Sequence, residues 1–214
     1  MSYIYKTGRA ELYEQIKRHA DSIRGRVLDV GSGNFSRYRN LFHFTEYIKM
    51  DIELGKDIDV AGKVEKIPFK DNEFDSIVCT QVLGDVYDLK KAFSEFYRVL
   101  RPEGKVLITE SLFDPLHDEP NDFWRFTEHS LRQLALDAGF KIDILERRGG
   151  YHSVTAQLKA RYWIELLGAN GKWYSHILSI ILKIRGTLAR FLDRHDKSRA
   201  NKIFTHGYLL ICLK

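Results

Sequence analysis

Hydrophobic residues follow two alternating patterns along the chain, short continuous runs and runs with helical spacing. Continuous runs rich in β-branched residues predict strands at residues 27–30, 47–50, 74–79, 105–109, 140–146 and 208–213, with a weaker strand at 64–68. Apolar residues three or four apart predict helices at 9–23, 88–100 and 128–138, and residues 101–104 predict a turn. This alternation predicts an α/β fold with a doubly wound, mostly parallel, seven-stranded sheet, which binds ligands beyond the carboxyl ends of its strands.

The composition favours one globular domain spanning residues 1–214. The chain is 44% hydrophobic, which is ample material for a packed core. Cys79 and Cys212 each lie in an apolar run, so we expect buried thiols and a reducing cytoplasm, and we assign no metal site. No segment has the ~20 apolar residues that spanning a bilayer requires, and the first residues lack the apolar core of an export signal.

A glycine loop follows the first predicted strand, in the sequence VLDVGSG at residues 27–33. Gly31 and Gly33 allow a tight turn and a close approach of the backbone to a ligand. Asp51 ends the next strand, where its carboxylate can accept hydrogen bonds from both hydroxyls of a ribose. These residues predict a nucleoside site, and NAD remains an alternative to a nucleoside without phosphate. NAD-binding loops favour a third glycine at the position of Ser36, which a ligand without phosphate does not need.

Two further blocks, VEKIPFKDNEFDSIVCTQVLGDV from Val64 and YRVLRPEGKVLI ending at Ile108, resemble the class I S-adenosylmethionine-dependent methyltransferases of the small-molecule type. The resemblance covers about residues 25–146 and implies a Rossmann-like methyltransferase fold and S-adenosylmethionine as cofactor. The chain departs from the family pattern at Lys63, where many relatives have an acid, and at Gly84-Asp85, where they often have a histidine pair. The resemblance implies that the cofactor is surrounded by Gly31, Gly33, Asp51, Val64, Glu65 and Gln81, with Asp29 supporting the loop. With the neighbouring Ser32 and Ile52, these are the residues that we expect to bind the cofactor.

The loop after the fifth strand concentrates titratable and aromatic side chains, in the sequence HDEPNDFWRFT at 117–127. It resembles a segment of bacterial methyltransferases that act on surface glycans, glycolipids or other small metabolites. Methyl transfer to a hydroxyl needs a group that takes up the proton, and positioning supplies much of the rate. We therefore assign catalytic roles to His117, Glu119, Asp122 and Arg125. The structural alternative is that Thr127 caps a helix, that Arg125 pairs with Asp122 or Glu119, and that the aromatic residues belong to the core.

A helical insertion of more than fifty residues, at 150–205, precedes the last predicted strand. Residues 151–205 hold ten Lys/Arg and three Asp/Glu, whereas the rest of the chain is slightly acidic. From His176 onward the polar residues form one narrow helical stripe, the other faces are apolar, and Gly186 is a candidate bend. Burial against the domain or a second subunit is the default expectation. The more specific alternative is that the insertion contacts an anionic membrane surface. Binding of nucleic acid is a third option, which we place below the other two.

The sequence therefore predicts a methyltransferase that uses S-adenosylmethionine and modifies a small-molecule, glycan or lipid-linked acceptor on oxygen or nitrogen. We expect a cytoplasmic protein without a transmembrane segment, with peripheral contact at the inner membrane as an option. The alternatives are a nicotinamide-dependent oxidoreductase and an inactive nucleoside-binding scaffold of the same fold.

Overall fold

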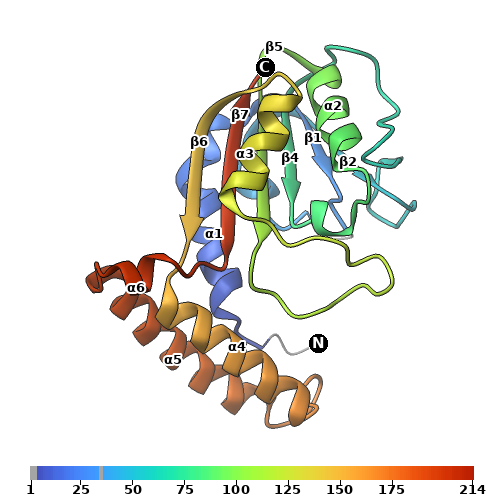
Figure 1. The fold of residues 1–214 in the computed structure, drawn as a ribbon. Helices are drawn as coiled ribbons and strands as arrows, with labels where there is room; N and C mark the ends of the chain where they lie inside the picture. The colour runs from blue at the N-terminus through green and yellow to red at the C-terminus, as the bar shows by residue number, and fades with distance from the viewer. Residues whose placement is uncertain (1–3, 34–35) are drawn as a thin grey trace. The chain divides into compact units, whose positions relative to one another are not determined.

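A computed structural model describes residues 4–33 and 36–214 (Figure 1). The chain forms two compact units. Unit 1 contains the residues up to Gln15, Phe113–Pro115 and Arg147–Gly207, and unit 2 contains Ile16–Leu112, Leu116–Glu146 and Tyr208–Lys214. That residues 1–214 act as a single domain remains a prediction.

Unit 2 is built on a seven-stranded sheet with the strand order β3-β2-β1-β4-β5-β7-β6. The pairs β1–β2, β1–β4, β2–β3 and β4–β5 are parallel, and Figure 1 shows β6 and β7 running in opposite directions. The strands are β1 (Arg24–Val30), β2 (His43–Asp51), β3 (Val60–Ala61), β4 (Phe74–Thr80), β5 (Leu100–Ser111), β6 (Lys141–Arg148) and β7 (Gly207–Leu213). The predicted doubly wound, mostly parallel fold is confirmed.

Two local predictions were wrong. Residues 64–68 do not form a strand but a turn closed by an isolated bridge between Lys63 and Lys66, and the third strand is the short β3. Residues 101–104 belong to β5, because the register with β4 shifts from the pair Phe74–Leu100 to the pair Ser76–Lys105 and the extra residues bulge from the ladder. A Pro-x-Gly sequence that signals a turn is thus accommodated as a bulge within one strand.

Helices with apolar faces cover the sheet of unit 2. Asp88 caps α2, where its side chain accepts a hydrogen bond from the Lys91 backbone N–H at 3.0 Å, and the helix buries Phe93 and Phe96 against the core. Thr127 caps α3 in the same way through the Ser130 N–H. The helices of unit 2 are α2 (Leu89–Val99) and α3 (Glu128–Asp137), with the 3₁₀ turns η1 (Ala20–Ser22), η2 (Arg39–Leu41) and η3 (Leu83–Asp85). Helix α1 (Thr7–His19) begins in unit 1 and continues into η1.

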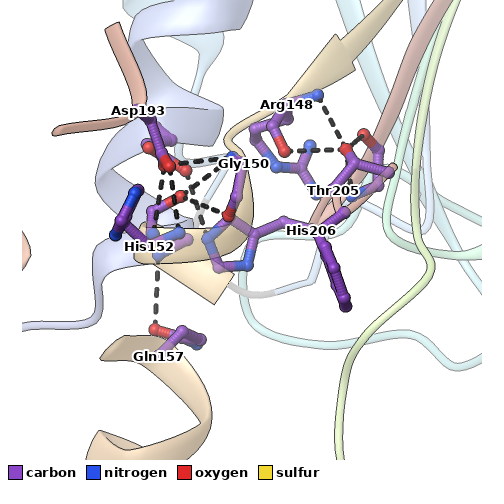
Figure 2. Close-up of polar contacts among 12 residues, drawn as sticks. Arg148, Gly150, His152, Gln157, Asp193, Thr205 and His206 are labelled. Atoms are coloured by element: carbon purple, nitrogen blue, oxygen red, sulfur yellow. Dashed lines mark hydrogen bonds and ion pairs between the residues drawn. The ribbon is translucent and has the colours of Figure 1, made fainter. Parts of the chain in front are cut away.

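The predicted helical insertion forms α4 (Tyr151–Leu166), α5 (Ser175–His195) and α6 (Arg199–Lys202) in unit 1. Asp193 on α5 binds the first turn of α4, where its carboxylate accepts hydrogen bonds at 3.0 Å from the backbone N–H groups of Gly150, His152 and Ser153 (Figure 2). A carboxylate at a helix N-terminus satisfies N–H groups that have no partner within the helix and interacts favourably with the helix dipole. This contact ties the two long helices of the insertion together.

Helix α5 runs through Gly186 without interruption. A Cβ at this position would lie 2.4 Å from the Thr7 hydroxyl oxygen and 2.9 Å from a ring carbon of Tyr5. The glycine therefore permits close packing of the helix against the N-terminal segment of unit 1, and it does not mark a bend. In the part of the chain that the structure describes, no helix has the length and apolar character needed to cross a membrane.

Candidate active site

The glycine loop lies at the carboxyl end of β1, in the middle of the sheet. The Gly31 N–H donates to the Met50 carbonyl at 2.8 Å, which joins the loop to β2. Gly31 has a φ of 65°, and a Cβ there would lie 2.3 Å from a methyl group of Val82. Gly33 also has a positive φ, of 59°, but among the residues that the structure describes a Cβ on it would meet nothing within 4 Å. Gly31 is thus needed for backbone and packing, whereas the described residues leave Gly33 without a close neighbour in the direction of a side chain.

This difference gives a stability test. We expect Gly31→Ala to destabilise unit 2 by about 2 kcal/mol, from left-handed backbone strain and overlap with Val82. Gly33→Ala should show the strain alone, about 1 kcal/mol. Urea unfolding of both variants and of Gly31→Ala with Val82→Ala measures the two contributions. Equal losses for the two glycines would contradict the packing role of Gly31.

Asp51 ties the loops after β1 and β2 together. One carboxylate oxygen accepts from the Gly33 N–H at 2.8 Å and the other from the Ile52 N–H at 2.7 Å. A carboxylate has about four acceptor positions, so both oxygens retain capacity for the hydroxyls of a ribose. The geometry fits the nucleoside site predicted from the sequence.

Asp29 supports the loop from beneath. It is 5% exposed and accepts hydrogen bonds from the Tyr47 hydroxyl at 2.8 Å and the Ser36 hydroxyl at 3.1 Å. Burial raises the pKa of Asp29 to about 6, against the opposing effect of these hydrogen bonds. Ser36, which stands where a dinucleotide-binding loop favours glycine, therefore anchors the loop to the strand.

The other predicted cofactor residues occupy different environments. Ile52 is 65% exposed beyond the end of β2, Glu65 is half-buried, and Val64 is a core residue. Gln81 follows β4 with a φ of 59°, accepts from the Ser111 hydroxyl at 2.5 Å and contacts Thr109 on β5. Ser32 lies in the glycine loop, where its N–H is 3.3 Å from the Met50 carbonyl oxygen. Contact of these residues with a cofactor remains a prediction.

Glu110 is a buried acid beside the candidate site that the sequence analysis missed. It is 3% exposed at the end of β5, and its carboxylate accepts from the Val82 and Leu83 N–H groups at 3.1 and 2.8 Å. It thereby fixes the start of η3, directly after the predicted cofactor residue Gln81. An acid within the apolar run of β5 was the available signal, because an unpaired charge is rarely buried.

The loop at 117–127 contains a tight ion pair. Arg125 donates to both oxygens of Asp122, at 2.6 and 2.9 Å, and the His117 N–H donates to Asp122 at 2.9 Å. The hydrogen bonds from Arg125 hold the pKa of Asp122 below its ordinary range, so this residue stays an anion. The His117 ring nitrogen Nδ1 lies 3.4 Å from the Asp122 carboxylate, and the ring is 42% exposed. Glu119 is exposed.

This loop is anchored to the segment that follows β4. The Phe123 and Trp124 N–H groups donate to the Gly84 carbonyl at 2.9 and 3.0 Å, and the Trp124 indole donates to the Val86 carbonyl at 3.0 Å. The predicted pairing of Arg125 with Asp122 and capping by Thr127 are confirmed, and Phe126 is core. Phe123 and Trp124 are instead 41% and 42% exposed. The catalytic roles assigned to His117, Glu119, Asp122 and Arg125 remain predictions.

Residues 28–108 match the protein family described as "Methyltransferase domain". This segment of the chain is therefore similar in sequence to a methyltransferase domain. It begins in β1 and ends in β5, so it contains the glycine loop, Asp51 and Gln81. The cofactor of this family is S-adenosylmethionine, in agreement with the sequence-based prediction.

Two curated relatives share part of this methyltransferase domain. The chain is 36% identical over 126 residues to an uncharacterized protein of Methanocaldococcus jannaschii, covering 54% of this chain and 55% of that protein. It is 34% identical over 114 residues to the ubiquinone/menaquinone biosynthesis C-methyltransferase UbiE of Haemophilus ducreyi, covering 42% and 44%. The chain thus spans about half the length of the curated relatives it matches.

Solved structures agree on the fold of the methyltransferase domain. The (4+2)-cyclase SpnF gives a TM-score of 0.60 at 20% identity, covering 96% of this chain and 80% of that one. Phosphoethanolamine N-methyltransferase 2 of Haemonchus contortus, in complex with S-adenosyl-L-methionine, gives 0.54 at 19% identity, covering 96% and 52%. A cyclase in this group illustrates that the fold alone does not define the reaction.

Proposed function

We propose that the chain transfers a methyl group from S-adenosylmethionine to a small amphiphilic acceptor whose hydroxyl group loses a proton to His117. The observation that carries this proposal is the anchoring of the 117–127 loop to Gly84 and Val86, a few residues beyond Gln81. This attachment supports the proposal, because it ties the loop that carries His117 and Asp122 to the segment after β4 that begins with the predicted cofactor residue Gln81.

The Asp122–His117 arrangement suits a general base. Asp122 is held by Arg125 and stays anionic, and the Nδ1 atom of His117 lies 3.4 Å from both the Asp122 carboxylate and the Arg125 guanidinium. This pair can orient the ring, while the exposed ring can reach an acceptor. When bound, S-adenosylmethionine would supply the methyl group. An electron-rich acceptor atom would bond to the methyl carbon as the carbon–sulfur bond breaks, and the electron pair of that bond would stay on sulfur. In this proposal His117 is the catalytic base, and Asp122 and Arg125 are positioning residues.

Exposed apolar side chains favour an amphiphilic acceptor. Tyr87 is 73% exposed and its ring packs edge-on against that of Phe123, with 5.4 Å between centroids; Leu116 is 76% exposed. The UbiE relative is named for the C-methylation of quinone precursors. A phenolic or quinol-type acceptor combines an apolar body with an acidic hydroxyl, and its deprotonation activates both the oxygen and the neighbouring ring carbon. We therefore prefer this class to a polar glycan.

A histidine substitution tests the base. We expect His117→Gln to lower the rate of methyl transfer at neutral pH about 100-fold, a typical contribution of general-base catalysis, and to leave the dissociation constant for S-adenosylmethionine unchanged. The rate is measured with methyl-labelled cofactor and a panel of naphthoquinols, phenols and sugars. His129→Gln, which changes an exposed histidine on α3, is the matched control. An unchanged pH–rate profile in His117→Gln would exclude His117 as the base.

Calorimetric titration distinguishes this function from its alternatives. We expect binding of S-adenosylmethionine and S-adenosylhomocysteine. Binding of NADH alone would indicate an oxidoreductase, and binding of none of the three would indicate a scaffold.

A further inference from the structure

Helix α5 has two apolar faces, and the described part of unit 1 covers one of them. The covered face consists of three small residues and one leucine that pack against the rest of unit 1, namely Ser175, Gly186, Ala189 and Leu182. The other face is formed by large apolar side chains that are 39–65% exposed. We call them the α5 stripe; they are Ile177, Ile180, Ile181, Ile184, Leu188, Phe191 and Leu192.

The stripe runs along most of the helix. Its members recur three or four residues apart, so they project from one side of α5, and at 1.5 Å per residue they extend over roughly 22 Å. Single exposed apolar side chains are common on protein surfaces and need no explanation. Seven large apolar residues in one continuous row form a patch, and such patches mark interaction surfaces.

Basic residues flank the stripe. Lys183, Arg185 and Arg194 are exposed on α5, and the helix contains a single acid, Asp193, which is engaged at the N-terminus of α4. The nearby Asp196 accepts from the Ser198 N–H at 2.9 Å and lies 3.4 Å from His152. The accessible charge beside the stripe is therefore positive.

Exposed aromatic residues also lie in the segments that precede α5 in the chain. Trp173, two residues before α5, is 83% exposed, and Tyr162 and Trp163 near the end of α4 are 63% and 44% exposed. Tryptophan and tyrosine combine an apolar ring with a polar group, which suits the boundary between water and lipid.

We propose that the α5 stripe and Trp173 insert into the headgroup–acyl boundary of an anionic lipid surface, with α5 lying parallel to that surface. The exposed lysine and arginine residues then meet anionic headgroups while the aliphatic side chains leave water. A second copy of the chain fits this surface less well, since a symmetric contact across α5 would bring together the lysine and arginine residues of both copies, and the single acid of this helix, Asp193, is engaged at the N-terminus of α4. The inference does not depend on which acceptor is methylated.

Vesicle co-sedimentation tests the surface with the full chain. We expect the protein to pellet with vesicles of phosphatidylcholine and phosphatidylglycerol in equal parts, to bind phosphatidylcholine alone far more weakly, and to be released by salt. The double variant Ile184→Ser with Leu188→Ser should partition at least about tenfold more weakly. Its matched control is Leu54→Ser with Leu136→Ser, which removes two exposed leucines of unit 2 and should change nothing.

The charge contribution has its own variant. Lys183→Gln with Arg185→Gln should weaken binding to the anionic vesicles and abolish most of its salt dependence. Circular dichroism and thermal unfolding verify that each variant is folded. Sedimentation velocity without lipid then measures self-association.

Three outcomes would overturn the proposal. They are failure to pellet with anionic vesicles at low salt, unchanged partitioning of the folded stripe variant, and a dimer that the stripe substitutions dissociate in a protein that does not bind lipid. A loss of lipid binding with unchanged binding of S-adenosylmethionine would support docking through α5 whatever the outcome of the His117 experiment.

Discussion

Asp51→Ala is expected to weaken the binding of S-adenosylmethionine by about 100-fold or more. Asp51 is placed to accept hydrogen bonds from two ribose hydroxyls, and hydrogen bonds to a charged group are worth about 1.5–3 kcal/mol each. The substitution also releases the Gly33 and Ile52 N–H groups that the carboxylate holds at 2.8 and 2.7 Å, so the loops after β1 and β2 lose a connection. Isothermal titration calorimetry measures the change.

Two companion variants separate these effects. Asp51→Asn preserves the shape of the side chain and removes its charge, so it should lose less affinity than Asp51→Ala. Asp57→Ala removes an exposed carboxylate from the same connection and should bind normally. If Asp51→Ala bound as tightly as the unchanged chain, Asp51 would not be the ribose ligand.

Glu11 should lower the stability of unit 1 as the pH rises from about 4.5 to 7, and Glu11→Gln should remove this contribution. The carboxylate oxygen Oε2 of Glu11 lies 3.2 Å from the Nε2 atom of His206, and both side chains are largely shielded from solvent. Burial raises the pKa of Glu11 to about 7, Asp193 adds to the shift, and Arg148 and Arg190 oppose it. The folded state therefore keeps a proton that the unfolded state releases near pH 4.5.

The sign of the effect follows from proton linkage. At the Glu11 site the unfolded state binds fewer protons than the folded state over this pH range, so the contribution of Glu11 to the free energy of unfolding decreases, by up to about 3 kcal/mol at pH 8. His206 acts in the opposite direction over an overlapping range, so the two contributions largely cancel between about pH 4.5 and 6.5 and the net decline falls above about pH 6.5. Burial lowers the pKa of His206 to about 3, so its contribution to stability decreases as the pH falls below about 6.5, where the unfolded histidine takes up a proton.

Urea unfolding between about pH 5 and pH 8 checks this prediction. At pH 8 we expect Glu11→Gln to be more stable than the unchanged chain by about 1–3 kcal/mol. Glu14→Gln, at an exposed position of the same helix, should follow the unchanged chain. Parallel pH profiles for all three proteins would show that Glu11 does not carry the proton.

The sequence predicted most of unit 2 because its signals are local. Continuous, mostly apolar runs indicate strands that are covered on both faces of a sheet. Two such runs, Val27–Val30 and Phe74–Cys79, are indeed strands in the interior of the sheet. The tight turn at Gly31 and the carboxylate at the strand end, Asp51, could likewise be predicted without knowledge of the residues around them. β3 could not, because a two-residue strand has too few side chains to form a pattern.

Features that depend on distant residues were not predictable in this way. The capping of α4 by Asp193 joins residues about forty positions apart, and Glu11 meets His206 from nearly opposite ends of the chain. Helix α5 is apolar on several sides, and periodicity cannot tell which of them the fold covers. The choice of small residues for the covered face, such as Gly186 and Ala189, becomes clear only from the packing.

The position of β7 has a consequence for biosynthesis. β7 lies between β5 and β6, so among the described strands β6 is an edge strand whose one neighbour is β7. Because β7 follows the insertion in the chain, a ribosome synthesises residues 150–205 before β7 is available to pair with β5 and β6. Throughout that interval β6 and the flank of β5 expose unpaired backbone groups, which makes a nascent chain stalled within the insertion a target for chaperones and a nucleus for aggregation.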